Sequence, residues 1–126
     1  MDVYHALMPE PGHTPVLCRQ VLSLLEPQPG MICLDCTVGL GGHGAVIVPR
    51  LAPSGRYIAL DADPENAAFA GNVLRGTPVR VDAVHANFIE ARQVLDDLGI
   101  DGVDLMLADL GFASSQMNDP QRGLSF

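Results

Sequence analysis

The sequence predicts an α/β domain built around a parallel β-sheet. Short apolar segments typical of strands alternate with segments of helical periodicity from about residue 31 onward. A glycine-rich turn follows the first of these strands, and an aspartate stands at the end of three of the four. Because strands that alternate with helices form parallel sheets with right-handed crossovers, one helix-covered sheet is expected.

Length and composition fit one globular domain. The chain has 126 residues, of which 48% are hydrophobic and 17% charged, which is unlike a disordered chain. No apolar run approaches the roughly 20 residues of a membrane span, and residues 1–12 lack the features of a signal peptide, so we expect no membrane insertion and a cytoplasmic location. The 7 basic and 15 acidic residues give a net charge of −8, which argues against a large nucleic-acid surface within this chain.

The N-terminal part predicts a lead-in, a helix and a strand. Residues 1–12 contain two prolines and a glycine without any period, so they are expected to be a flexible lead-in. Thr14-Pro15 is typical of a helix start, because a hydroxyl cap is followed by proline at the first helical position. The apolar residues of this helix share one face: Leu17, Val21, Leu24 and Leu25. Residues 31–35 then predict a buried strand.

The glycine-rich turn at residues 37–44 is expected to lead into a helix over residues 45–51. This helix is weakly predicted, because it contains three β-branched residues and Pro49. Residues 56–61 predict the second strand. Asp63-Pro64-Glu65 predicts a well-capped helix start after it.

The remaining strands differ in character. Residues 79–84 alternate apolar and charged side chains, which is typical of a strand at the edge of a sheet. A helix is predicted over residues 89–98, with Gly99 beyond its end. Residues 102–108 predict a more apolar fourth strand that leads to Asp109.

The three cysteines are predicted to be free, buried or loop thiols. Cys33 and Cys36 form a CxxC, but the second pair that a zinc site needs is absent. Cys33 lies within a predicted strand rather than at the helix N-terminus that activates a redox cysteine. An odd number of cysteines, Cys18 included, fits reduced thiols, and no metal site is expected.

The glycine-rich turn predicts a cofactor site. Residues 39–44 match the pattern GxGxxG, and they follow a strand and precede a helix, which is the context that gives this pattern meaning. Asp61 ends the next strand, where an acid can accept hydrogen bonds from a ribose diol. Both features suit a nicotinamide cofactor and S-adenosylmethionine equally.

Three details favour S-adenosylmethionine. Asp35 places a carboxylate directly before the glycine turn, where it would attract a cationic methionine tail and repel a pyrophosphate. Phe88 follows the third strand, where its ring can lie against adenine. Asp109 ends the fourth strand, at the point that would face the transferred methyl group.

Several segments together resemble the ribosomal RNA small-subunit methyltransferase H family. They span almost the whole chain: residues 13–17, 35–43, 61–64, 109–111, 114–119 and 122–126. The resemblance implies the N-terminal part of a Rossmann-like S-adenosylmethionine-dependent methyltransferase domain over residues 13–126. The inserted substrate domain and the later strands of the family would then be absent, with the sheet truncated after the fourth strand.

The resemblance also implies a reaction, which is methylation of the exocyclic N4 of a cytidine in small-subunit (16S) rRNA. It assigns the methionine end of the cofactor to Gly41, Gly42 and His43, the ribose to Asp61 and the adenine to Phe88. It adds two residues that complete the pocket, Asp109 and Gln116.

Candidate catalytic groups are Asp109 and the carbonyls of Leu110 and Gly111, since acceptors that hold the hydrogens of the cytosine amino group would align its lone pair. A fourth strand without its next neighbour would leave an exposed edge, so self-association and marginal stability are expected. A non-catalytic remnant or nucleotide-binding module is the main alternative function. An NAD-dependent oxidoreductase is a weaker one, favoured only by the glycine pattern.

Overall fold

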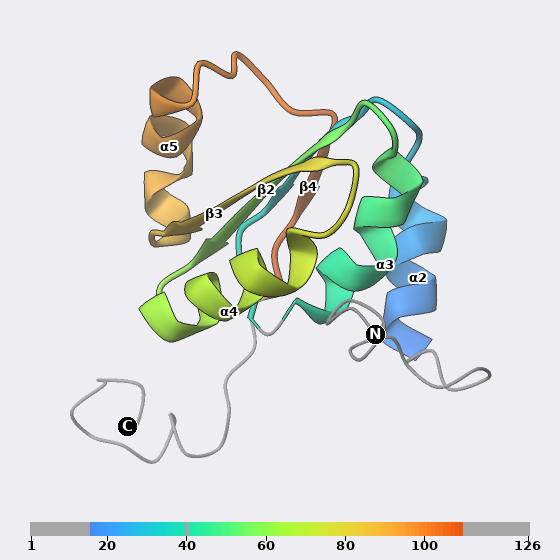
Figure 1. Cartoon of the computed structure of the whole chain (residues 1–126), viewed down its shortest axis with the longest axis horizontal. Coiled ribbons are helices and arrows are strands. Elements are labelled where there is room, and N and C mark those ends of the chain that lie inside the picture. The colour runs from blue at the N-terminus through green and yellow to red at the C-terminus, as the bar shows by residue number, and fades with distance from the viewer. Residues whose placement is uncertain (1–15, 40, 110–126) are drawn as a thin grey trace.

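The computed structural model describes residues 16–39 and 41–109, which form a parallel sheet covered by helices on both faces (Figure 1). The strands are β1 (Ile32–Asp35), β2 (Arg56–Asp61), β3 (Arg80–His85) and β4 (Leu105–Leu107), in the spatial order β3-β2-β1-β4. The helices are α2 (Val16–Leu25), α3 (Gly42–Leu51), α4 (Pro64–Leu74), the short 3-10 helix η1 (Phe88–Glu90) and α5 (Ala91–Asp97). All three strand pairs are parallel, as predicted.

Two hydrophobic cores lie on opposite faces of the sheet. The first holds Cys33 and Tyr57 against helices α2, α3 and α4, whereas the second holds Leu34 and Ile58 against α5. Consecutive residues within each of the strands β1 and β2 therefore point to opposite faces, as the period of a strand requires. Cys36 belongs to the second core, so the two cysteines of the CxxC lie on opposite sides of the sheet. All three cysteines are free and buried, as predicted.

Helix α4 forms as its sequence predicts, because the side chain of Asp63 accepts a hydrogen bond from the backbone N of Glu65 (2.9 Å) and Pro64 occupies the first turn. Gly99 adopts φ +73° just beyond α5. Strand β3 lies at one edge of the sheet, where its first and last residues are exposed and the others are partly buried. The alternating pattern of this strand was therefore interpreted correctly.

Three elements differ from the prediction. The helix expected over residues 89–98 consists of the 3-10 helix η1 followed by α5, which begins at Ala91 and ends at Asp97. Helix α3 begins at Gly42 rather than at residue 45, because Gly41 caps it and the last residues of the predicted turn form its first turn. It ends at Leu51 as predicted, and its β-branched residues are buried although Pro49 is exposed. Strand β4 covers three residues rather than seven. The carboxylate of Asp104 accepts the backbone N–H of Ile32 (2.8 Å), and the regular pairing with β1 starts only after it.

Helix α3 packs closely on its neighbours at Gly44. A Cβ atom there would lie 2.9 Å from Cδ1 of Leu74 and 3.3 Å from the ring and hydroxyl of Tyr57. The absence of a side chain at Gly44 therefore allows α3 to pack closely against β2 and α4, and the backbone conformation does not require glycine. The close packing fixes the start of α3, and with it the glycine turn, against the end of the sheet.

The predicted lead-in (residues 1–12) and the start of the first helix at Thr14-Pro15 lie outside the described residues, as does everything after Asp109. Among the residues that the structure describes, no helix is long and apolar enough to cross a membrane.

Candidate functional site

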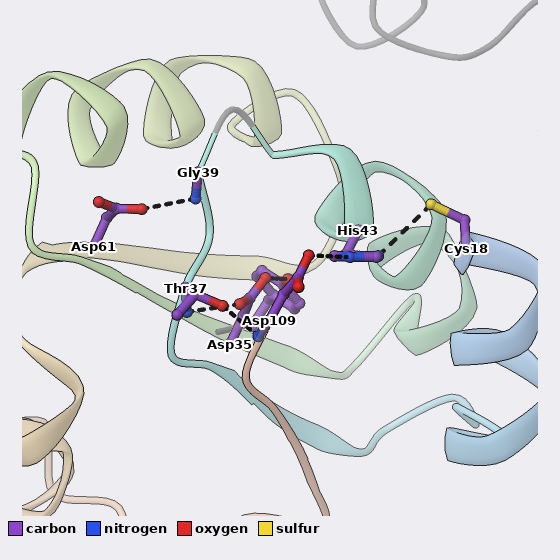
Figure 2. A network of polar contacts seen from close by, with 8 residues as sticks. Cys18, Asp35, Thr37, Gly39, His43, Asp61 and Asp109 are labelled. Atoms are coloured by element: carbon purple, nitrogen blue, oxygen red, sulfur yellow. Dashed lines mark hydrogen bonds and ion pairs between the residues drawn. The ribbon is translucent and has the colours of Figure 1, made fainter. Parts of the chain in front are cut away.

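The predicted site residues gather where parallel strands reach their carboxyl ends. Asp35 ends β1, Asp61 ends β2 and Asp109 follows β4, and the turn that contains Gly39 passes between them (Figure 2). Ligands of open α/β sheets bind at this edge, next to the point where the order of strands reverses. In this sheet the reversal lies between β1 and β4, so the three carboxylates lie at or next to the expected position, with Asp35 buried and Asp61 and Asp109 at least partly exposed.

The glycine turn presents its backbone to open space at Gly42. Gly41 caps α3 with φ +86°, a left-handed conformation that glycine adopts without strain. The first helical hydrogen bond runs from the backbone N of Ala45 to the carbonyl of Gly41 (2.8 Å), so the amides of Gly42 and His43 precede it. Gly42 is exposed, and a Cβ atom there would meet nothing within 4 Å. A ligand can therefore approach the backbone closely at this helix start.

Asp61 connects the glycine turn to β2. Its Oδ2 accepts a hydrogen bond from the backbone N of Gly39 and its Oδ1 accepts one from the backbone N of Asp63, both at 2.8 Å. These two bonds fix the orientation of a partly exposed carboxylate at the end of the strand. Each carboxylate oxygen can accept a second hydrogen bond, so Asp61 remains able to bind a hydroxyl group.

Asp35 lies behind the turn, fully buried. Its Oδ2 accepts the hydroxyl of Tyr57 (2.5 Å) and its Oδ1 accepts the backbone N of Thr37 (3.0 Å). Burial raises the pKa of Asp35 above its usual value, whereas the hydrogen bonds from Tyr57 and Thr37 act in the opposite direction. The same burial, together with the charge of Asp35, raises the pKa of Tyr57 well above its usual value. The buried carboxylate of Asp35 therefore holds the backbone at the start of the glycine turn through its hydrogen bond with Thr37.

Asp109 is held from two sides. Its backbone N donates to the hydroxyl of Thr37 (2.7 Å), and its Oδ2 lies 3.4 Å from Nε2 of His43. The other ring nitrogen of His43, Nδ1, lies 3.6 Å from Sγ of Cys18 on α2 (Figure 2). Beside this row of side chains is a cavity of about 220 Å³, which His43 and Asp109 line together with Val21, Leu107 and Ala108.

Phe88 lies on η1, beyond the end of β3, and about half of its surface is exposed. A capping box formed by Asn87 and Glu90 holds this short helix in place. The ring is therefore available for stacking. The other predicted site residues, Leu110, Gly111 and Gln116, lie outside the described residues. Within residues 16–39 and 41–109, no group of three or more histidine, cysteine or acidic side chains could hold a metal ion.

The sequence prediction missed three residues of this network: Cys18, Thr37 and Tyr57. Only Tyr57 carried a usable signal, because a tyrosine inside an apolar strand needs a polar partner when it is buried. Asp35 on the neighbouring predicted strand was the obvious candidate. The contacts of Cys18 and Thr37 depend on how α2 and β4 pack, which no local pattern specifies.

The fold is shared with known methyltransferases. It is similar to a SAM-dependent O-methyltransferase from Thermotoga maritima, with a TM-score of 0.60 and 24% identity over 76% of this chain and 35% of that one. It is also similar to TrmN from Thermus thermophilus, with a TM-score of 0.59 and 26% identity over 81% of this chain and 30% of that one. These similarities confirm the predicted Rossmann-like methyltransferase fold.

Relatives with curated names are more similar in sequence. Ribosomal RNA small subunit methyltransferase H from Heliobacterium modesticaldum is 43% identical over 90% of this chain and 37% of its own length. The protein of the same name from Thioalkalivibrio sulfidiphilus is 44% identical over 94% of this chain and 38% of its own length. The chain thus spans well under half the length of these relatives. The model of the MraW methylase family matches residues 10–126, and the chain therefore belongs to that family.

Proposed function

We propose that this chain forms the S-adenosylmethionine-binding part of an enzyme that methylates N4 of a cytidine in small-subunit rRNA. The observation that carries the proposal is the grouping of Asp35, Asp61 and Asp109 at the carboxyl edge of the sheet, next to a glycine turn whose backbone is exposed at Gly42. The relatives named as small-subunit rRNA methyltransferases support the substrate class.

The charge of the site fits this cofactor better than it fits NAD. S-adenosylmethionine carries a sulfonium and an ammonium group, and three carboxylates near the turn would attract both. The pyrophosphate of NAD carries two negative charges, which the same carboxylates would repel. The exposed backbone at Gly42 adds room for close approach by the methionine end.

Each predicted cofactor residue has a role that suits its position. The backbone amides of Gly42 and His43 would bind the methionine carboxylate, because free amides at a helix start favour an anion. The amide of Gly41 donates to the carbonyl of Val38 (2.9 Å), so Gly41 would contribute through the left-handed conformation that turns the chain into α3. The open lone pairs of Asp61 would accept the ribose hydroxyls, and the half-exposed ring of Phe88 would stack on the adenine. When bound, S-adenosylmethionine supplies a methyl group activated by a positively charged sulfur.

The remaining residues would act on the base. The carboxylate of Asp109, with the carbonyls of Leu110 and Gly111, would accept hydrogen bonds from the amino group of cytosine. Such acceptors align the lone pair of the nitrogen and stabilise the positive charge that develops on it. Gln116 would complete the pocket, and the base would have to be unpaired or flipped to reach it.

A methyl-transfer assay tests the proposal. The chain would be incubated with labelled S-adenosylmethionine and small ribosomal subunits that lack the modification, followed by nucleoside analysis of the rRNA. Label in N4-methylcytidine is the expected result, and Asp109→Asn is expected to reduce it. Cofactor binding without any transfer would instead favour the second candidate function, a nucleotide-binding module that performs no chemistry.

A further inference from the structure

Three side chains from separate elements lie in a row beside the proposed site (Figure 2). Cys18 comes from α2, His43 from the first turn of α3 and Asp109 from the segment that follows β4. Sγ of Cys18 is 3.6 Å from Nδ1 of His43, and Nε2 of His43 is 3.4 Å from Oδ2 of Asp109. The imidazole thus lies between a thiol and a carboxylate, with one nitrogen facing each.

The chemistry of the two partners selects one tautomer of the ring. An ionised carboxylate only accepts hydrogen bonds, so Nε2 must carry the hydrogen that points to Asp109. In a neutral imidazole, Nδ1 then has a free lone pair, which can accept the S–H of Cys18. Burial raises the pKa of the Cys18 thiol, which keeps this donor protonated at neutral pH.

The contact matters because the Asp109 side chain has little other support. About half of its side chain is exposed, whereas that of His43 is mostly buried. The backbone of Asp109 is fixed by Thr37, but within the described residues only the His43 ring is within hydrogen-bond distance of its carboxylate. A ring that changes its tautomer or rotates would release that carboxylate toward solvent.

The cavity of about 220 Å³ adjoins this carboxylate. Its other walls are apolar and come from Val21, Leu107 and Ala108, and both polar walls belong to the row, His43 and Asp109. A planar base with one polar edge suits such a space, provided that the carboxylate stays in place.

We propose that Cys18 and His43 are positioning residues that orient the Asp109 carboxylate toward the amino group of the target base. This inference rests on the proposed function, because it assigns Asp109 the acceptor role in methyl transfer. Cys18 acts through His43, and neither side chain itself needs to contact the base.

The direct test is the tautomer of His43, measured by long-range ¹H–¹⁵N correlation NMR at about pH 8, where an ordinary histidine is neutral. The signal is assigned by comparison with His43→Gln. Wild-type protein is expected to show hydrogen on Nε2. Cys18→Ala removes the donor that holds Nδ1 in place, so the ring can rotate away from the long contact with Asp109 and a mixture of tautomers is expected. Cys18→Ser, which keeps a donor, is expected to restore the Nε2 form.

Cys36→Ala is the matched control, because Cys36 is also a buried thiol but lies in the core on the opposite face of the sheet. It should leave the tautomer unchanged. In the transfer assay, Cys18→Ala should lower the rate by about tenfold to a hundredfold, as misplacement of a reacting group does, with little change in affinity for S-adenosylmethionine.

Two results would overturn the inference: hydrogen on Nδ1 in the wild-type protein, or an unchanged tautomer in Cys18→Ala. Both are independent of the proposed function. Loss of S-adenosylmethionine binding in the wild-type chain would instead refute the proposed function, while the NMR result would still report on the row of side chains.

Discussion

Replacing Tyr57 by phenylalanine removes one hydroxyl from the inside of the site and leaves the ring packing in place. Tyr57 and Asp35 are both fully buried, and their hydrogen bond has a length of 2.5 Å. A hydrogen bond to a charged group contributes about 1.5–3 kcal/mol. The variant should therefore lose that amount of unfolding free energy at pH 7, which corresponds to roughly a tenfold to hundredfold change in the unfolding equilibrium.

The loss should depend on pH, because it concerns the charged form of Asp35. Burial raises the pKa of Asp35, and the Tyr57 hydroxyl opposes that rise, so the variant should have a still higher pKa at this position. A carboxyl group whose pKa is higher in the folded than in the unfolded protein makes a contribution to stability that depends on pH. This contribution is fully present below the pKa of the unfolded state and is lost as pH rises through the pKa of the folded state. The penalty of Tyr57→Phe should therefore grow from pH 4 to pH 7.

Urea denaturation of both proteins between pH 4 and pH 7 measures this penalty. The same substitution in an Asp35→Asn background is the control, since the amide can still accept the hydroxyl but carries no charge. There the penalty should be smaller and independent of pH. A penalty that is equal at all pH values in both backgrounds would refute the role assigned to the buried pair.

Three further predictions concern the turn, the thiols and the sheet edge. Gly44→Ala should destabilise the fold by about 1–3 kcal/mol in urea denaturation, because the new Cβ would lie 2.9 Å from the side chain of Leu74. Gly42→Ala is the control and should leave the stability unchanged, because a Cβ there would meet no atom within 4 Å. Equal effects of the two substitutions would contradict the packing described. Burial and the charge of Asp35 raise the pKa of Cys33 to about 12, so this thiol should not react with a disulfide reagent at pH 8 until the protein unfolds. Rapid labelling of the native protein would contradict the burial of Cys33. Met106 is 59% exposed on the edge strand β4, so Met106→Lys should reduce any concentration-dependent association measured by sedimentation velocity. Unchanged association would show that the chains contact each other through another surface.

The sequence was sufficient to predict the architecture, because the signals for each strand and helix are local. The cap at Asp63 and the alternating residues of β3 each specified their element without help from the rest of the chain. Helix α3 was predicted too short because Gly42, His43 and Gly44 were assigned to the glycine-rich turn, whereas the helix is capped at Gly41 and Gly44 is buried within its first turn. Strand β4 was predicted too long because its pairing depends on Asp104 and Ile32, which are 72 residues apart.

The candidate site was predicted in position but not in detail. Carboxylates at the ends of parallel strands must share one edge, so the grouping of Asp61 and Asp109 followed from the order of elements. The burial of Asp35 did not, because it depends on Tyr57 from the next strand. The row of Cys18, His43 and Asp109 joins three elements whose relative placement is set by packing alone.

The most direct test of the account is calorimetric titration of the chain with S-adenosylmethionine, with NAD as the control ligand. We expect saturable binding of S-adenosylmethionine alone, and a large loss of affinity in Asp61→Ala, whose carboxylate would accept the ribose hydroxyls. Asp97→Ala is a matched control, because this acid lies on the exposed surface of α5, away from the carboxyl edge of the sheet. Binding of NAD in place of S-adenosylmethionine, or no binding of either ligand, would contradict the claim that this edge is a methyltransferase cofactor site.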